Sequence, residues 1–177
     1  MAAECVGARG KSYRMKKFGF AADEMVKIID AHFAPLLFYA QQWDAVAAED
    51  IVQEAFLKLL RQSHQKGCPE NVAAWLFRVV RNGAISRFRK NRRRKEHEHK
   101  HGQSRINWSV PTQETAFEQA EMAEMLDQLP IEQRELVIMR IWGGLSFDEM
   151  AGLTNVSRTT VFRKYNQALE TLKERLG

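Results

Sequence analysis

The feature that most constrains this chain is the pattern of residues between positions 145 and 165, near its C-terminal end. Ser146 precedes a short segment of helical periodicity that ends at Leu153, and a side-chain hydroxyl at that place caps a helix. Asn155 follows where a sharp turn needs left-handed backbone, which asparagine tolerates better than most non-glycine residues. Ser157 then stands as the cap of a second helix. The buried residues expected for this second helix recur at intervals of three and four: Val161, Tyr165, Ala168 or Leu169, Leu172 and Leu176.

The two helices form either a plain helical hairpin or a helix-turn-helix that binds DNA. Phe147, Met150 and Ala151 are the inward positions of the first helix, and Ala151 is small where two such helices cross closely. The order of turn residue, apolar residue, capping serine and buried valine over positions 155–161 is more specific than amphipathicity alone. We therefore interpret the segment as a DNA-binding helix-turn-helix.

The hydrophobic content suits a small globular protein, and the positive net charge suits an acidic partner. The chain has 177 residues, 45% of them hydrophobic, and a net charge of +5, which is enough for one medium domain or two small helical ones. Cys5 and Cys68 have no metal-ligand spacing, and no stretch approaches the roughly 20 apolar residues that cross a bilayer. We expect a reduced, cytoplasmic protein with no disulfide, no signal peptide and no membrane insertion.

Helical periodicity without any strand pattern predicts an all-α fold of two small helical domains joined by a flexible linker. The predicted helices cover residues 22–43, 49–62, 72–95, 116–129 and 130–142, and the helix-turn-helix follows. Pro35 makes the first of them either one kinked helix or two shorter ones. The segment Ser63 to Asn71 is a predicted loop that Asn71 ends as a helix cap. The expected units are a basic, disordered arm (1–21), a helical bundle (22–95), the linker (96–113) and the helix-turn-helix domain (114–177).

The predicted helix over residues 72–95 has two faces of opposite character. Its apolar face comprises Val72, Leu76, Val79, Val80 and Gly83. Almost opposite lie the polar residues Arg78, Arg81, Asn82, Arg89, Arg92 and Arg93. Trp75 stands near the boundary, with Phe77 and Phe88 on the other flank. This face either binds a phosphate backbone and stacks on unpaired bases, or is a solvated basic surface whose aromatic residues belong to the core; the downstream helix-turn-helix favours nucleic acid.

The helix over residues 49–62 has the opposite polarity. When Val52, Phe56, Leu59 and Leu60 are buried, the exposed side carries Asp50, Gln53 and Glu54. Carboxylates that point away from the basic helix repel DNA, so this face meets either solvent or a protein. By itself the pattern favours solvent.

Three segments in this order resemble one family of proteins. They are AEDIVQEAFLKLL (48–60), AAWLFRVVRNGAISRFRKNRRR (73–94) and LPIEQRELVIMRIWGGLSFDEMAGLTNVSRTTVF (129–162). Together they look like a bacterial RNA polymerase sigma factor of the small extracytoplasmic-function (ECF) group, which has the helical domains called sigma-two and sigma-four. The resemblance covers roughly residues 22–176. Two departures are Ser86, where the family often has aspartate, and Asn155, where it usually has glycine.

The resemblance implies a role for each surface. The acidic face of Asp50, Gln53 and Glu54 would dock on the clamp helices of the largest subunit of core RNA polymerase. The loop from Ser63 and the helix from Trp75 would recognise and melt the minus-ten promoter element, with one base flipped out of the stack. Candidate residues around that base are Trp75, Arg78, Arg81 and Asn82, and candidate backbone contacts are Arg89, Arg92, Arg93 and Arg94.

The second helix of the helix-turn-helix would enter the major groove of the minus-thirty-five element. Its candidate contacts are Ser157, Arg158, Thr159, Thr160, Arg163 and Lys164. Arg158 or Arg163 would read a guanine edge, whereas the hydroxyls fit bases or phosphates equally. An anti-sigma factor is a further possible partner, on which the sequence carries no mark.

The residues suggest no catalytic chemistry, metal or cofactor. His97, His99 and His101 alternate within the expected linker, where no fixed set of partner ligands is evident, so we expect no metal site. One alternative function is a helix-turn-helix transcriptional regulator with an N-terminal protein-interaction domain. Another is a recombinase-like or transposase-like enzyme, which needs a nucleophilic serine or tyrosine, or an acidic metal triad, that we do not find in the N-terminal half. We expect a non-enzymatic factor that binds promoter DNA and core polymerase.

Overall fold

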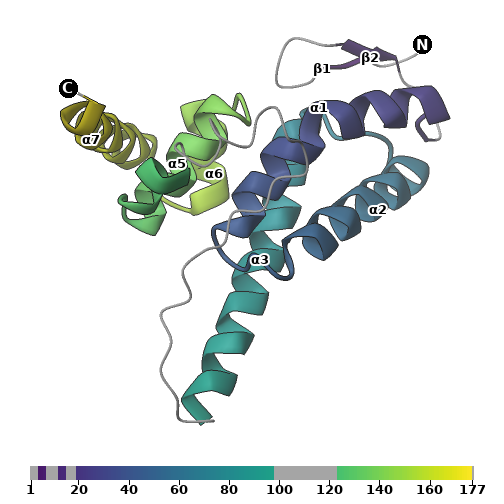
Figure 1. Cartoon of the computed structure of the whole chain (residues 1–177). Coiled ribbons are helices and arrows are strands. Elements are labelled where there is room, and N and C mark those ends of the chain that lie inside the picture. The colour runs from purple at the N-terminus through teal and green to yellow at the C-terminus, as the bar shows by residue number, and fades with distance from the viewer. Residues whose placement is uncertain (1–3, 7–11, 15–18, 98–122, 177) are drawn as a thin grey trace.

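The computed structural model describes residues 4–6, 12–14, 19–97 and 123–176, with side chains described for 19–92 and 123–174. Three long helices form an N-terminal bundle: α1 (Ala22–Gln41), α2 (Ala48–Lys66) and α3 (Val72–His97). Three helices form a C-terminal bundle, preceded by helical residues 123–127: α5 (Ile131–Ile141), α6 (Phe147–Thr154) and α7 (Arg158–Leu176). The two bundles lie against each other, and the second half of α3 extends beyond α1 and α2 (Figure 1). The all-α, two-domain prediction is confirmed.

The N-terminal bundle is held together by the apolar faces of its three helices. Ile28 and Leu36 of α1, Val52 and Leu59 of α2, and Leu76 of α3 are fully buried. Full burial of an aliphatic side chain of this size contributes about 1.5–3 kcal/mol. Pro35 lies inside α1, which continues past it as one helix.

Helix α2 is longer than the sequence suggested. The predicted loop from Ser63 is wrong over its first four residues, because α2 continues to Lys66. Ser63 is fully buried, and its hydroxyl donates a hydrogen bond of 2.8 Å to the carbonyl oxygen of Leu60 within the helix. The helix ends at Gly67, whose φ of 85° only glycine adopts readily. Asn71 caps α3 as predicted, because its Oδ1 accepts from the backbone N–H of Ala74 at 3.0 Å.

The C-terminal bundle rests on α5 and α7, which pack along each other. Val161 and Ala168 of α7 are fully buried, in agreement with the predicted stripe. Buried Arg134 of α5 forms an ion pair of 2.6 Å with Asp127 and donates to the carbonyl oxygens of Asp127 and Leu129. This guanidinium therefore fixes the segment before α5 against the helix itself.

The N-terminal arm differs from the expectation of disorder without strands. Strands β1 (Glu4–Val6) and β2 (Ser12–Arg14) pair antiparallel, with Cys5 opposite Tyr13. Valine and tyrosine, which both occur in these segments, favour extended backbone. The predicted linker over 96–113 is wrong at its start, because α3 continues to His97. The rest of that linker, with His99 and His101, and the predicted helix start at 116 lie outside the described residues. None of the described helices is long and apolar enough to span a membrane.

Candidate nucleic-acid interface

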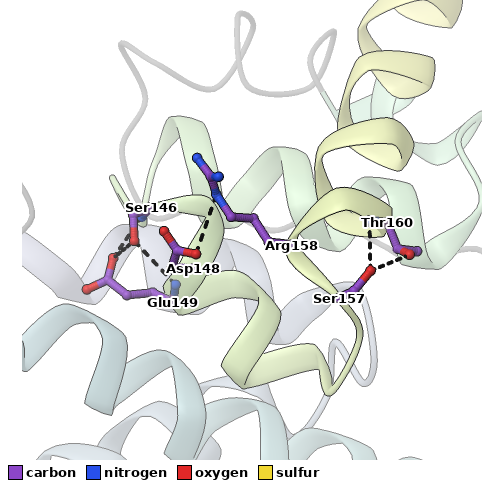
Figure 2. A network of polar contacts seen from close by, with 6 residues as sticks. All are labelled: Ser146, Asp148, Glu149, Ser157, Arg158 and Thr160. Carbon is purple, nitrogen blue, oxygen red and sulfur yellow. Dashed lines mark hydrogen bonds and ion pairs between the residues drawn. The ribbon is translucent and has the colours of Figure 1, made fainter.

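The first helix of the helix-turn-helix begins with a complete capping box. The Ser146 hydroxyl accepts from the backbone N–H of Glu149 at 3.3 Å, and Glu149 Oε2 accepts from the Ser146 backbone N–H at 2.7 Å (Figure 2). Two otherwise unpaired backbone donors are thus satisfied reciprocally. The predicted cap at Ser146 is confirmed, and it fixes where α6 starts.

The turn and the second cap also follow the prediction. Asn155 has φ 59° and ψ 37°, in the left-handed region, and it ends α6. The Ser157 hydroxyl accepts from the backbone N–H of Thr160 at 3.2 Å and lies 2.8 Å from the Thr160 hydroxyl (Figure 2). The start of α7 is therefore set by local hydrogen bonds rather than by distant packing.

Aromatic contacts fix the angle between α6 and α7. The ring of Phe147 on α6 meets Phe162 and Tyr165 of α7 edge-on, with centroid distances of 5.3 and 5.5 Å. The guanidinium of Arg140 lies 4.9 Å from the centre of the Phe147 ring. Phe162, which is 50% exposed, was not among the predicted site residues, because an apolar residue beside a buried stripe gives no separate sequence signal.

The predicted recognition residues lie at the start of α7 and are mostly exposed. Ser157, Arg158, Thr159 and Arg163 are exposed, whereas Thr160 and Lys164 are half-buried. Arg158 Nε lies 3.4 Å from Asp148 Oδ1 of α6, and both side chains are more than two-thirds exposed (Figure 2). An exposed pair of this kind contributes about 0–1 kcal/mol, so Arg158 can leave it for a stronger acceptor.

The basic face predicted for α3 exists on the structure. Arg78, Asn82, Arg89 and Arg92 are exposed, and Trp75 and Arg81 are half-buried. A hollow of about 550 Å³ lies along this face and is lined by Arg81, Asn82, Ile85, Ser86, Arg89 and Lys90. Arg93 and Arg94 belong to α3, but their side chains lie outside the described part. The lining carries three cations, so the hollow suits an anionic ligand.

The aromatic residues of α3 divide between the two interpretations. Phe77 is fully buried, and Tyr39 meets its ring edge-on at 5.3 Å, so Phe77 belongs to the packed interior and does not face the solvent. Phe88 is 40% exposed and lies edge-on to Trp43 at 6.0 Å. The expectation that Phe77 flanks the arginine face is wrong, because the C-terminal bundle covers this side of the helix.

Arg81 makes a contact that sequence reasoning missed. Its Nε donates to Glu135 Oε1 of α5 at 2.5 Å, and the Tyr39 hydroxyl donates to the same oxygen at 3.2 Å. Burial raises the pKa of Glu135, although Arg81 and Tyr39 oppose that rise. Burial also raises the pKa of Tyr39 well above its ordinary range, and Glu135 adds to this. The partners are 54 and 96 residues from Glu135 in sequence, so no local pattern reveals them.

The predicted docking face on α2 is exposed as expected. Asp50, Gln53 and Glu54 share the outer side of the helix with Leu57, an apolar residue that is 52% exposed. Lys58 lies 3.0 Å from Glu54, and its hydrogen bond lowers the pKa of that carboxyl. Asp50 does not point away from α3, since its Oδ2 lies 3.8 Å from Arg87.

Among the residues that the structure describes, no group of three or more potential metal ligands comes together. Comparison with known proteins shows that two segments of the chain match known protein families. The Sigma-70 region 2 family matches residues 31–94, and the Sigma-70 region 4 family matches residues 119–172. The two matches contain the basic face of α3 and the helix-turn-helix, respectively.

Curated relatives and solved structures agree with the family matches. The ECF RNA polymerase sigma factor EcfG of Rhodopseudomonas palustris is 35% identical over 132 residues, which cover 73% of this chain and 71% of that protein. The ECF RNA polymerase sigma factor SigL of Mycobacterium tuberculosis is 30% identical over 162 residues, which cover 88% and 92%. The fold is similar to that of the sigma factor RpoE in complex with the anti-sigma factor NepR from Bartonella quintana, with a TM-score of 0.68, 24% identity, and coverage of 88% and 98%. It is also similar to CnrH in complex with the cytosolic domain of CnrY, with a TM-score of 0.59, 20% identity, and coverage of 88% and 89%. The chain belongs to the ECF group of RNA polymerase sigma factors.

Proposed function

We propose that this sigma factor directs promoter-specific initiation through three surfaces that the structure describes: the outer face of α2, the basic face of α3 and the start of α7. The observation that carries the proposal is their combination in one chain of two bundles. A helix-turn-helix alone fits a repressor or an activator equally well, whereas an acidic docking helix beside a basic helix fits a subunit that holds polymerase and DNA together.

The outer face of α2 is the proposed contact with core polymerase, on the clamp helices of its largest subunit. Asp50, Gln53 and Glu54 offer acidic and amide groups, and Leu57 adds an exposed apolar side chain on the same side. A protein interface needs such apolar area at its centre and charges around it, whereas a purely solvated face does not. This combination supports protein contact over solvent for α2.

The basic face of α3 is the proposed site where the minus-ten element is recognised and opened. Arg78, Asn82 and the lining of the hollow supply cations and hydrogen-bond donors, and half-buried Trp75 supplies an aromatic surface. Arg89 and Arg92, with Arg93 and Arg94 beyond them, follow the backbone of the DNA in the proposal. Extruding one base costs a few kcal/mol, which stacking and pocket contacts offset.

The start of α7 is the proposed contact with the minus-thirty-five element. Arg158 and Arg163 are exposed and long enough to reach a guanine edge, and the hydroxyls of Ser157, Thr159 and Thr160 reach bases or phosphates, with Lys164 a turn later. Because local caps and the Phe147 cluster hold α7 in place, these side chains are presented without any rearrangement of the helix. This rigidity supports its role as the positioning contact.

The chain acts by binding and hydrolyses nothing in this proposal. DNA opening is driven by contacts with the separated strand, and the chemistry of transcription belongs to the polymerase. No cofactor enters this scheme. Because the polymerase and the chromosome are its targets, we propose that the protein works in the cytoplasm.

An anti-sigma factor is the proposed restraining partner. The sigma factor RpoE of Bartonella quintana was solved in complex with the anti-sigma factor NepR, and its fold covers 88% of this chain. A partner of that kind is expected to abolish transcription by this protein when added in equimolar amount.

Run-off transcription with purified core polymerase tests the proposal. Mapping transcription start sites after overexpression supplies the promoters, which are then used as templates with intact or scrambled minus-ten and minus-thirty-five elements. We expect a transcript only when the protein is present and both elements are intact. The alternative, a helix-turn-helix regulator with an N-terminal interaction domain, predicts no initiation by core polymerase plus this protein. Failure both to bind core and to start transcription would remove the proposal.

A further inference from the structure

A buried polar contact joins the two bundles at the middle of α5. Glu135, which is 3% exposed, accepts hydrogen bonds from Arg81 of α3 at 2.5 Å and from Tyr39 of α1 at 3.2 Å. Each of these three residues belongs to a different helix. The carboxylate belongs to the C-terminal bundle, whereas both donors belong to the N-terminal one.

Close packing surrounds this contact. Phe38 of α1 lies against Trp142, with centroids 5.2 Å apart. Gly143 follows Trp142, and a Cβ atom placed there would lie 2.7 Å from the ring of Phe77 on α3. Glycine at position 143 therefore lets the two bundles approach this closely, because any side chain there would collide with Phe77.

A second polar link lies at the ends of two helices. The Asn71 side chain caps α3 through its Oδ1, and its amide nitrogen donates to Glu149 Oε1. The other oxygen of Glu149 completes the cap of α6 with Ser146. One amide and one carboxylate thus connect the beginning of the DNA-melting helix to the beginning of the helix-turn-helix.

The packing of the two bundles depends on the partners of the buried Glu135 carboxylate. A charge that leaves water is tolerated only when it is paired and hydrogen-bonded, and loss of one partner leaves the other uncompensated. If the bundles separate, Glu135 and Arg81 are both hydrated, so neither charge prevents the open arrangement. The pair therefore acts on the equilibrium between the two arrangements and leaves each bundle intact.

We propose that Glu135, Arg81 and Tyr39 form a clasp that holds the free protein closed and keeps Arg81 away from DNA. This inference rests on the proposed function, which assigns Arg81 to the minus-ten element. In the closed arrangement only 19% of the Arg81 side chain is exposed, and its Nε–H is directed at Glu135. DNA and core polymerase then bind the open form, and their apparent affinity is lowered in proportion to the closed fraction.

Charge reversal at Glu135 tests the clasp in the full-length protein. Glu135→Lys places a cation against Arg81 in the closed form but faces water in the open form. Glu132→Lys is the matched control, because Glu132 is exposed one turn earlier on the same helix. Small-angle X-ray scattering measures the radius of gyration, which is about 16 Å for a compact chain of this length. We expect a larger radius for Glu135→Lys than for the wild type and for Glu132→Lys, with unchanged helix content.

A reciprocal change separates the clasp from damage to α5. Arg81→Glu alone is expected to open the protein, and the double variant Arg81→Glu with Glu135→Lys is expected to close it again. If the wild type is already as extended as Glu135→Lys, or if the double variant stays as open as the single ones, the clasp is rejected.

The transcription readout distinguishes this inference from the proposed function. With a closed fraction of nine-tenths, Glu135→Lys is expected to reach half-maximal run-off at up to about tenfold lower concentration than Glu132→Lys. If the radius changes but no variant initiates transcription, the function is wrong and the clasp stands. If Glu135→Lys and Glu132→Lys initiate as the wild type does and all three have equal radii, the function stands and the clasp is wrong.

Discussion

The two helices that we propose contact DNA, α3 and α7, differ in what holds their candidate residues in place. The start of α7 is fixed by its own cap and by contacts with α6, and four of its six candidate residues are exposed. The corresponding part of α3 is involved in contacts with the other bundle, where Phe77 is buried and Arg81 is paired with Glu135. The proposed minus-thirty-five surface is therefore exposed in this arrangement, whereas access to the proposed minus-ten surface depends on how the two bundles are arranged.

The largest expected effect is a loss of stability in the N-terminal bundle. Leu76 of α3 is fully buried in its core, so Leu76→Ala is expected to cost about 2–5 kcal/mol of unfolding free energy. Thermal unfolding followed by circular dichroism measures this loss. Arg78→Ala, on the exposed side of the same helix, is the control and should change stability by less than about 0.5 kcal/mol. Equal effects of the two substitutions would contradict the assigned core.

At the start of α7, the proposed minus-thirty-five contact, the loss of one arginine should affect promoter choice. Arg163→Ala is expected to reduce minus-thirty-five-dependent initiation by the equivalent of about 1–3 kcal/mol if the guanidinium makes a bidentate base contact. Run-off rates on intact and substituted minus-thirty-five elements give the measurement. Lys173→Ala, on the exposed surface near the end of α7, is the control. A loss that is equal on all sequences would instead assign Arg163 to phosphate.

The proposed docking face lies on α2, apart from both helices that are proposed to contact DNA, so its loss should leave both proposed DNA contacts unchanged. Glu54 is 56% exposed and is paired with Lys58 on the same helix. Glu54→Lys is expected to weaken core binding about tenfold, or about 1.4 kcal/mol, while the fold persists. Fluorescence anisotropy of labelled protein with core polymerase measures the affinity. Asp30→Lys makes the same charge change at an exposed position of α1, and equal affinities of the two variants would remove the α2 face from the interface.

The turn between α6 and α7 should tolerate glycine but not alanine. Asn155 adopts φ 59°, which costs most side chains about 1 kcal/mol or more, and glycine nothing. Asn155→Ala is therefore expected to lower the unfolding temperature of the C-terminal bundle and weaken minus-thirty-five binding, whereas Asn155→Gly keeps both. If Ala and Gly gave the same unfolding temperature, backbone conformation would not be what selects the residue here.

The sequence predicted the features that depend on a few neighbouring residues. The caps at Ser146, Ser157 and Asn71 and the left-handed Asn155 follow from rules that span three or four positions. The six candidate residues of the helix-turn-helix lie within residues 157–164, at the start of α7, so their grouping needed no tertiary information, and their DNA contacts remain predictions.

The features that the sequence did not reveal depend on distant packing. The predicted loop at Ser63 failed because burial stabilises a serine inside a helix, where its intrinsic preference opposes helix. Phe77 lies off the core face of α3 on a helical wheel, and its burial comes from Tyr39 of α1 together with the second bundle at Gly143. The partners of Glu135 come from helices far away in the chain, so its role requires the arrangement of both bundles.

The smallest expected effect is a pH dependence of the closed arrangement. Burial raises the pKa of Glu135 in the closed form, with Arg81 and Tyr39 opposing and Glu132 adding to the rise, whereas hydration in the open form returns it to the ordinary range. Closing therefore takes up a proton, so the closed form is most stable below the ordinary carboxyl pKa and loses stability as pH rises through the raised value. Arg81 and Tyr39 keep their protonation states throughout this window.

Scattering between about pH 4 and pH 8, a range that brackets the ordinary carboxyl pKa and any raised value, measures this dependence. We expect the radius of gyration of the wild type to increase with pH more steeply than that of Glu135→Gln, because glutamine does not titrate. Subtracting the two curves removes the contribution of every other carboxyl group, including exposed Glu132. A flat difference curve would mean that Glu135 is hydrated in the free protein, whereas a curve that falls with pH would mean that Arg81 outweighs burial and lowers the pKa of Glu135.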